Sequence, residues 1–254
     1  MSPNTTRLAG RTALVTGSTG GLGAAFATAL AEQGAFVIVT GRDWARGRGI
    51  VDRVESSGGS AAFVAADLGA GAAQVRRLAD EATASAGGRI DILVNNAAML
   101  ITPTPTPEVP EQLVRDALAV NVTAPFLLTG VIAPAMAERG AGSIINIGSI
   151  NGLIGMGGSA LYSATKAAIH SLTKSWADEY GPSGVRVNTV APGPSMTERS
   201  AQFADYLAPL LARVPSRRAS TLSEVAAAVV FLASDDAANI TGATLSVDGG
   251  WSAV

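Results

Sequence analysis

Short apolar runs alternate with longer amphipathic stretches along almost the whole chain, and no other feature limits the fold as strongly. Runs such as Phe36–Thr40 carry no charge, whereas stretches such as Trp44–Ser57 place their apolar residues at helical spacing. Uncharged strands are typical of parallel sheets whose two faces are both covered by helices. The alternation therefore predicts an α/β fold: a three-layer, doubly wound, Rossmann-type parallel sheet of about seven strands with helices on both faces.

The same pattern gives bounds for each expected element. The expected strands are Thr12–Thr16, Phe36–Thr40, Ala61–Ala66, Ile90–Val94, Ser143–Ser149, Val185–Val190 and Ala243–Val247. The expected helices are Ala24–Gln33, Trp44–Ser57, Ala72–Ala86, Glu111–Val120, Val122–Arg139, Ala160–Tyr180 and Leu222–Ser234. The Pro-rich segment Thr102–Pro110 is expected to be a surface connection. The least regular segment, 195–219, is expected to be mobile and to cover a substrate.

Composition removes several classes of function. The 254 residues are 48% hydrophobic and carry a net charge of −2, so we expect neither nucleic acid nor a membrane as a partner. No apolar run reaches the roughly 18 residues of a membrane span. The chain has no cysteine, and His170 is its one histidine, so we expect no disulfide, no metal site and no Ser-His-Asp triad. These properties fit a cytoplasmic protein.

The first apolar run leads directly into a glycine-rich turn and an Ala-rich helix. A strand, a glycine-rich turn and a helix in this order form a phosphate site, because the free N–H groups and the positive end of the helix attract a pyrophosphate. We interpret the turn as a dinucleotide site rather than as a merely tight turn. The residues expected to contact the cofactor are Gly17, Ser18, Thr19, Gly21, Leu22 and Gly23.

The end of the second expected strand bears on the choice of cofactor. In a nucleotide-binding βαβ unit, an acid at this point accepts from the 2′-hydroxyl of NAD, whereas an arginine binds the 2′-phosphate of NADP. Gly41 takes the acidic position and Arg42 follows it, which favours NADP(H), with NAD(H) as the alternative. Arg42 could also be a solvated charge, and Asp43 could accept from the ribose. Asp67, after the third strand, is either an adenine contact or a helix cap.

A tyrosine and a lysine lie one turn apart on an expected helix. The spacing of Tyr162 and Lys166 puts a phenol and an ammonium on one helix face. A neighbouring cation lowers the pKa of a phenol, which is roughly 10 when unperturbed. Ser149 ends the fifth expected strand. Asn121 interrupts an apolar stretch, where a buried amide needs hydrogen-bond partners. Asn121 could position a water that connects Lys166 to solvent.

The predicted topology brings these groups together. Gly17, Asn95 and Ser149 all lie at expected carboxyl ends, which share one edge of a parallel sheet. Serine, tyrosine and lysine beside a dinucleotide predict interconversion of a carbonyl and an alcohol by hydride transfer. Tyr162 would act as general acid or base, and Ser149 would hydrogen-bond the reacting oxygen. Lys166 would lower the pKa of Tyr162 and bind the nicotinamide ribose.

On these residues the chain resembles the short-chain dehydrogenase/reductase family, in its single-domain oxidoreductase branch, over essentially its whole length. The matching motifs are Thr16-Gly17-x-x-x-Gly21-x-Gly23, Asp67, Asn95-Asn96-Ala97, Asn121, Ser149, Tyr162-x-x-x-Lys166, Pro192-Gly193 and Asp248-Gly249-Gly250. The resemblance implies one dinucleotide-binding and catalytic domain over 1–254 and a homotetramer or homodimer. The implied catalytic tetrad is Asn121, Ser149, Tyr162 and Lys166. The further implied cofactor contacts are Asp67, Leu68, Asn95, Ala97, Tyr162, Lys166, Pro192, Gly193, Ser195 and Thr197, with Met196 beside the last two.

The chain departs from the family pattern at two positions. Ala98 stands where the family usually has glycine, and Gly148 stands where serine is frequent. Neither change removes a group that the chemistry needs. Two other functions stay open: a non-catalytic dinucleotide-binding or sensing module, and a non-redox lyase or dehalogenase. Intact catalytic and glycine residues disfavour both.

The substrate is less well defined than the reaction. The expected contacts to a small carbonyl or alcohol substrate are Ser149, Asn151 and Tyr162. The apolar residues Leu153, Ile154 and Met156 favour a hydrophobic or mixed ketone over a sugar.

Overall fold

The computed structural model describes residues 6–197 and 204–253. Its strands form one all-parallel sheet in the order β3-β2-β1-β4-β5-β6-β7. The strands are β1 (Thr12–Val15), β2 (Phe36–Gly41), β3 (Ser60–Ala65), β4 (Ile92–Asn95), β5 (Gly142–Ile147), β6 (Val185–Pro192) and β7 (Thr244–Val247). The strand order reverses between β1 and β4, which is where doubly wound sheets bind their ligands. The expected seven-stranded Rossmann-type fold is confirmed.

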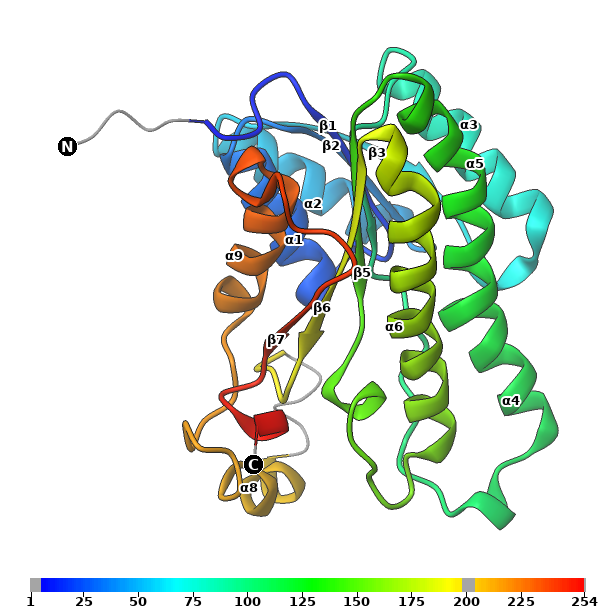
Figure 1. Ribbon diagram of the computed structural model, residues 1–254, viewed down its shortest axis with the longest axis vertical. Helices are drawn as coiled ribbons and strands as arrows, with labels where there is room; N and C mark the ends of the chain where they lie inside the picture. The colour runs from blue at the N-terminus through cyan, green and yellow to red at the C-terminus, as the bar shows by residue number, and fades with distance from the viewer. Residues whose placement is uncertain (1–5, 198–203, 254) are drawn as a thin grey trace.

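Helices cover both faces of this sheet (Figure 1). One layer holds α1 (Gly21–Glu32), α2 (Trp44–Ser56) and α9 (Leu222–Ala233). The opposite layer holds α3 (Ala72–Ser85), α5 (Ala124–Glu138) and α6 (Ala160–Tyr180). Because side chains alternate along a strand, each strand feeds both cores: Ala13 and Val15 of β1 pack under the first layer and Leu14 under the second.

The helix before β5 is continuous where the sequence predicts a join. α4 (Glu111–Leu118) runs through a π-helical turn, Ala119–Thr123, into α5. By length and composition alone, the run Glu111–Glu138 could cross a membrane, although the sequence led us to expect no such helix. Its apolar character has another cause here, because α5 packs between α3 and α6 and buries Leu128 and Met136 in the second core.

Other differences from the expected bounds have local causes. α1 begins at Gly21, inside the glycine turn, because glycine at a φ of 54° lets the turn pass straight into the helix. The Pro-rich segment contains a short 3₁₀ turn, Thr106–Glu108. The segment 195–219, expected to be irregular, contains α8 (Ala204–Leu211), and its residues 198–203 lie outside the described residues.

A chain of polar side chains runs through the second core. Asn95 Nδ2 donates to Thr129 Oγ1 (3.2 Å) and to Asn146 Oδ1 (2.9 Å). Asn146 Nδ2 donates to Thr173 Oγ1 (2.8 Å), which lies 2.7 Å from Thr189 Oγ1. All five residues are buried. The chain thus joins α5, β4, β5, α6 and β6 by side-chain hydrogen bonds.

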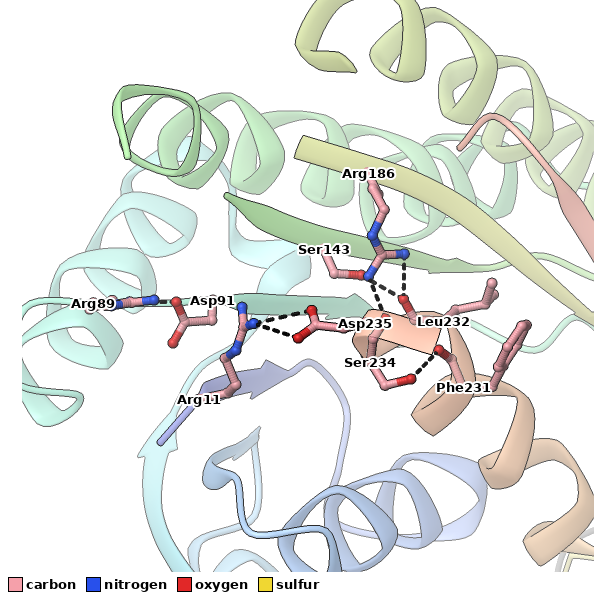
Figure 2. A network of polar contacts seen from close by, with 9 residues as sticks. All are labelled: Arg11, Arg89, Asp91, Ser143, Arg186, Phe231, Leu232, Ser234 and Asp235. Atoms are coloured by element: carbon pink, nitrogen blue, oxygen red, sulfur yellow. Dashed lines mark hydrogen bonds and ion pairs between the residues drawn. The ribbon is translucent and has the colours of Figure 1, made fainter. Parts of the chain in front are cut away.

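The amino edge of the sheet is held by a second polar network (Figure 2). Asp91, which is 2% exposed, accepts from the backbone N–H of Thr12 through Oδ2 (2.9 Å) and pairs with Arg89 through Oδ1. Arg186 Nη1 donates to the carbonyl of Leu232 (2.7 Å), and Nη2 donates to the carbonyl of Ser234 (3.0 Å). These contacts tie the starts of β1, β4 and β6 to the end of α9, on the edge opposite the predicted site.

We predict that Asp91→Ala lowers the free energy of unfolding by about 2 kcal/mol, because it leaves the buried Thr12 N–H without an acceptor. Urea titration followed by circular dichroism measures the effect. Asp235→Ala is the control: its carboxylate pairs with Arg11 at the surface with 83% side-chain exposure, so we expect a change below about 1 kcal/mol. Equal losses in the two variants would contradict a special role for the buried carboxylate.

Candidate active site

The glycine turn after β1 is held against the segment that follows β4. Thr16 Oγ1 accepts from the backbone N–H of Asn96 (2.9 Å) and of Ala97 (3.0 Å). Asn96 Nδ2 donates to the carbonyls of Thr16 (2.8 Å) and Gly17 (3.1 Å). A Cβ at Gly17 would come within 2.8 Å of Ala97 Cα, so the two segments touch at backbone distance. The structure therefore brings Gly17 and Ala97 together, as expected of cofactor contacts.

The start of α1 has the character of a phosphate site. No side chain caps α1, so no side-chain acceptor pairs with the first backbone N–H groups of this helix. A Cβ at Gly23 would collide with the carbonyl oxygen of Gly17, which keeps this turn free of side chains. The methyl group of Thr197 lies 4.0 Å from the position of a Cβ on Gly21, so the segment after β6 reaches the same turn. These residues fit a pyrophosphate.

Several predicted cofactor residues direct their side chains elsewhere. Ser18 Oγ donates to the carbonyl of Val15 (2.7 Å) and accepts from the N–H of Thr40 (2.9 Å). Leu22 and Leu68 pack against the first and second cores, respectively. These three residues can approach a ligand at the turn mainly through their backbone.

Asp67 and Asn95 also have internal roles. Asp67 Oδ1 accepts from the N–H of Gly69 (3.0 Å) and so caps the short 3₁₀ turn Leu68–Ala70, whereas α3, the helix expected next, begins after Gly71; the adenine contact stays a prediction. The side chain of Asn95 belongs to the buried polar chain. Its Oδ1 has no hydrogen-bond partner among the described residues.

The end of β2 bears on the expected NADP preference. A Cβ at Gly41 would approach Thr19 Cγ2 to 2.6 Å, so the Thr19 side chain takes the space that an acidic side chain would need. Arg42 is exposed at the strand end. Asp43, the alternative ribose acceptor, instead caps α2 and accepts from the N–H of Arg46 (3.0 Å).

Tyr162, Ser149 and Lys166 come together at the carboxyl ends of the strands. Ser149 follows β5 and is buried, and Tyr162 and Lys166 lie in the first two turns of α6. The Ser149 side chain lies near enough to the Tyr162 hydroxyl to lower its pKa. Lys166 Nζ lies 5.7 Å from the centre of the Tyr162 ring and donates to the carbonyl of Ile147 (2.8 Å). Three of the four predicted catalytic groups therefore form one cluster.

The electrostatics of this cluster differ from the expected pattern. Burial raises the pKa of Tyr162 to about 12, and the Ser149 side chain lowers it by less. Burial lowers the pKa of Lys166 to about 8. The expected lowering of the phenol pKa by Lys166 is therefore not seen, because desolvation outweighs any charge effect in this buried site. At neutral pH, Tyr162 keeps its proton.

Asn121 lies in the π-helical turn between α4 and α5 and is 2% exposed. Its Oδ1 accepts from the N–H of Met99 (2.6 Å), and its Nδ2 donates to the carbonyl of Met99 (3.0 Å) and to Thr165 Oγ1 (3.2 Å). Asn121 thus joins the segment after β4 to α6, one residue before Lys166. Its part in a proton relay stays a prediction.

In the loop between β5 and α6, where the substrate is expected, some polar side chains are already hydrogen-bonded within the loop. Asn151 Nδ2 donates to Ser159 Oγ (3.0 Å), so this amide ties the loop between β5 and α6 together. Ile150, Val214 and Trp251 form a small third core. Its partly buried neighbours, from the same loop and the covering segment, are Ile154, Met156, Leu210 and Leu211.

The segment after β6 is held at the carboxyl edge of the sheet. Pro192 ends β6, and Gly193 lies against Asp248, with a Cβ at 193 only 2.8 Å from Asp248 Cα. Ser195 forms an isolated parallel bridge with Ser220. The ends of the covering segment are therefore anchored.

His170 fills the space behind Ser149. Its Nε2 is 3.0 Å from the carbonyl oxygen of Ser149, and its Nδ1 is 3.3 Å from Thr244 Oγ1. A Cβ at Gly148 would come within 2.6 Å of His170 Cε1, which explains why this position, often serine in the family that the chain resembles, is glycine here. His170 is therefore a packing residue of the fold, held between Ser149 and Thr244.

We predict that His170 makes the fold sensitive to acid. Burial lowers the pKa of His170, so below pH about 6.5 the unfolded chain takes up a proton that the folded chain refuses. Stability from the neutral ring is therefore complete above that pH and is lost as the pH falls. Urea titrations at pH 7.5 and pH 5.5 (about one unit on either side) should show a smaller loss for His170→Gln than for the wild type. Equal losses would contradict this.

The chain matches known proteins over nearly its full length. A family model described as enoyl-(acyl carrier protein) reductase matches residues 17–252. A solved short chain dehydrogenase/reductase family protein is 42% identical, covers 98% of this chain and 100% of its own, and superposes with a TM-score of 0.88. The chain belongs to the short-chain dehydrogenase/reductase family.

The descriptions of two further relatives of this short-chain dehydrogenase/reductase give a reaction or a cofactor. Cis-4-hydroxycyclohexanecarboxylate dehydrogenase of Sinomonas cyclohexanicum is 40% identical, over 96% of this chain and 97% of that protein. A crystal structure from Beutenbergia cavernae, described as a NAD(P)-dependent gluconate 5-dehydrogenase with bound NADP at low occupancy, is 37% identical, with a TM-score of 0.92 and coverage of 98% and 100%. The dehydrogenase studied here is thus an oxidoreductase of alcohol and ketone substrates.

Sequence reasoning missed some residues that shape the site of this short-chain dehydrogenase/reductase. Thr16 and Asn96 hold the glycine turn. The sequence pattern that could have revealed this role is the pair Asn95-Asn96 after β4. Thr165 fixes Asn121. Arg46 reaches the glycine turn from α2, which no local pattern revealed.

Proposed function

We propose that the protein is an NADP(H)-preferring carbonyl reductase or secondary-alcohol dehydrogenase with Tyr162 as its general acid and base. The contact between the Tyr162 hydroxyl and Ser149, beside the buried Lys166 and across the carboxyl edge from the glycine turn, carries the proposal. A bound nicotinamide cofactor would supply or accept the hydride. The chain itself has to hold the substrate oxygen and to move one proton.

In the reductive direction, each group of the cluster has a defined task. Ser149 donates a hydrogen bond to the substrate carbonyl oxygen, and Tyr162 gives its proton to the same oxygen as negative charge develops there. A phenol whose pKa is about 12 is protonated at neutral pH, which suits the donor role. Lys166 holds positive charge beside the phenol, and Asn121 holds α6 in place through Thr165.

The residues that would hold the cofactor form one continuous edge. Gly17, Gly21 and Gly23 leave the start of α1 open for the pyrophosphate. Thr197 lies beside that turn, where the nicotinamide end would follow. Thr19 blocks the acidic position at Gly41, and Arg42 is exposed there, which supports NADP(H).

Fluorescence titration of the purified protein with NADPH and NADH tests the cofactor assignment. We expect NADPH to bind at least about tenfold more tightly, since a charged hydrogen bond contributes about 1.5–3 kcal/mol. Equal or tighter NADH binding would contradict the preference. Failure to bind either dinucleotide would favour the non-redox alternative.

For the substrate, we propose a hydrophobic or mixed cyclic ketone and its secondary alcohol. The third core places Ile154 and Met156 beside the covering segment, which supports an apolar pocket wall. The Sinomonas relative, whose name gives a hydroxylated cyclohexane carboxylate as substrate, adds support. Oxidation of NADPH with a panel of cyclic ketones and keto sugars tests this, and turnover of the sugars alone would contradict it.

We further propose a cytoplasmic homotetramer in which segment 195–219 covers the substrate. Phe126 and Val131 of α5 are exposed at 52% and 39%, and Leu245 of β7 at 37%, so two separate faces offer apolar surface to other copies. Light scattering of the purified protein should give four times the chain mass. A monomer would contradict the assembly without touching the catalytic proposal.

A further inference from the structure

Arg46 extends from the first turn of α2 onto the glycine turn. Asp43 caps α2 by accepting from the N–H of Arg46, which fixes the direction in which this residue leaves the helix. Its guanidinium lies so close to Gly20 that a Cβ at that position would collide with Arg46 Nη2. Gly20 has a φ of 175°, which is extended backbone that any residue adopts. A Cβ at Gly20 would therefore displace the end of the Arg46 side chain from the glycine turn, without any conflict in the backbone.

The charge of Arg46 is available to a ligand. Among residues 6–197 and 204–253, the ion pairs involve neither Arg46 nor Arg42. The nearest carboxylate along the chain, Asp43, is engaged with the backbone as a helix cap. Arg46 is exposed, so a ligand at the glycine turn can reach it from solvent.

In the proposed cofactor site, Arg46 lies where the adenosine ribose would bind. Thr19 lies between Gly20 and the end of β2, since a Cβ on Gly41 would touch its side chain. Arg42 follows directly on that strand end. Arg42 thus stands at the end of β2 and Arg46 in the first turn of α2, and Asp43 between them is engaged as the cap of α2.

We propose that Arg46 binds the 2′-phosphate of NADPH from the α2 side and, with Arg42, determines the preference for this cofactor. The inference rests on the proposed NADP(H) dependence. A phosphate monoester carries a charge of about −1.5 to −2 at pH 7. A planar guanidinium donates two parallel hydrogen bonds to such an anion. NADH offers it only a neutral hydroxyl, so the two cofactors differ at this residue.

The chain provides a matched control on the same helix. Arg53 lies seven residues after Arg46, which is the same face of α2 two turns on. Both line a groove of about 1240 Å³ that runs along α1 between α2 and α9, and Arg46 lies with Gly20 at the end formed by the glycine turn. Arg53→Gln therefore removes the same charge from the same groove without touching the turn.

Equilibrium titration with NADPH and with NADH, without substrate, tests the proposal. We expect Arg46→Gln to weaken NADPH binding about tenfold or more and to change NADH binding less than about twofold. Arg53→Gln should change neither by more than about twofold. Equal effects of the two substitutions, or an unchanged ratio of NADPH to NADH affinity in Arg46→Gln, would overturn the role of Arg46.

A substitution that keeps every charge provides a second test. Gly20→Ala adds only the methyl group that displaces the Arg46 guanidinium, so it should weaken NADPH binding in the same direction. The double variant should bind NADPH no more weakly than Arg46→Gln alone, because both changes remove one interaction. Additive losses would overturn the inference. A wild type that binds NADH as tightly as NADPH would overturn both this inference and the proposed preference, whereas the outcomes above overturn this inference alone.

Discussion

Replacing Tyr162 by phenylalanine is expected to reduce turnover by about 10²–10⁴-fold, which is the usual contribution of a positioned acid or base. The change removes the hydroxyl near Ser149 while it keeps the ring that lies beside Lys166. Cofactor affinity should stay within about threefold of the wild type, since the glycine turn is untouched. Single-turnover oxidation of NADPH with a responsive ketone measures the loss.

Tyr180→Phe is the matched control for this prediction. Tyr180 ends the same helix, α6, and packs against the second core far from the carboxyl edge of the sheet. It should retain wild-type turnover. If Tyr162→Phe kept more than about a tenth of the activity, another group would have to move the proton, and the assignment of general acid would be wrong.

Lys166→Met is expected to abolish activity and, in the cofactor-free protein, to raise the free energy of unfolding by about 1–3 kcal/mol at pH 7. Burial lowers the pKa of Lys166 to about 8. A lowering from the ordinary lysine value corresponds to about 3 kcal/mol of destabilisation by the buried charge. The lost hydrogen bond to the Ile147 carbonyl offsets roughly 1 kcal/mol of that gain.

The pH dependence gives this prediction a definite sign. Below the folded pKa of about 8, both the folded and the unfolded chain hold the proton, so the full cost of the buried charge is present. Between that value and the ordinary lysine pKa the folded chain has lost its proton first, and the cost fades as the pH rises. Urea titrations of wild type and variant at pH 7 and about pH 10 measure the gap, which should narrow. A variant less stable than wild type at pH 7 would contradict the argument.

The expected gain in stability of Lys166→Met indicates that the buried lysine charge lowers the stability of the fold. Under the proposed mechanism, the buried cation is kept at a cost to the fold because the reaction needs a charge beside the phenol. A methionine of similar length fills the same space without that cost. The two measurements on one variant thus separate what Lys166 does for the reaction from what it does to the fold.

Patterns along the chain predicted the elements well where one local signal was strong. Gly17 to Gly23 between a strand and a helix is a strong local signal, whereas the spacing of Tyr162 and Lys166 gains its meaning only from the other residues predicted at the same sheet edge. The sheet then places both at one edge, as the parallel topology requires. Bounds erred by one to three residues where a helix starts inside a turn, as α1 does at Gly21.

Contacts between distant segments could not be read from the sequence. The inward direction of Ser18 depends on the N–H of Thr40, a backbone group 22 residues away that donates to its hydroxyl. Asn121 in the π-helical turn pairs through its amide with both backbone groups of Met99, which lies 22 residues earlier in the chain. The pKa of Tyr162 depends on burial, and burial is a property of the assembled fold.

The buried polar chain from Thr129 to Thr189 has a consequence for how this fold chooses among alternative pairings. Ile145 and Ile147 of β5 face the first core, whereas Asn146 faces the second, where Thr173 accepts from it. A slip of β5 by one residue would turn the Asn146 amide away from Thr173 and into the apolar first core, which costs several times more than a lost apolar contact. The buried polar chain therefore fixes the register of β5 and, through Thr173, the position of α6, the helix that carries Tyr162, relative to the sheet.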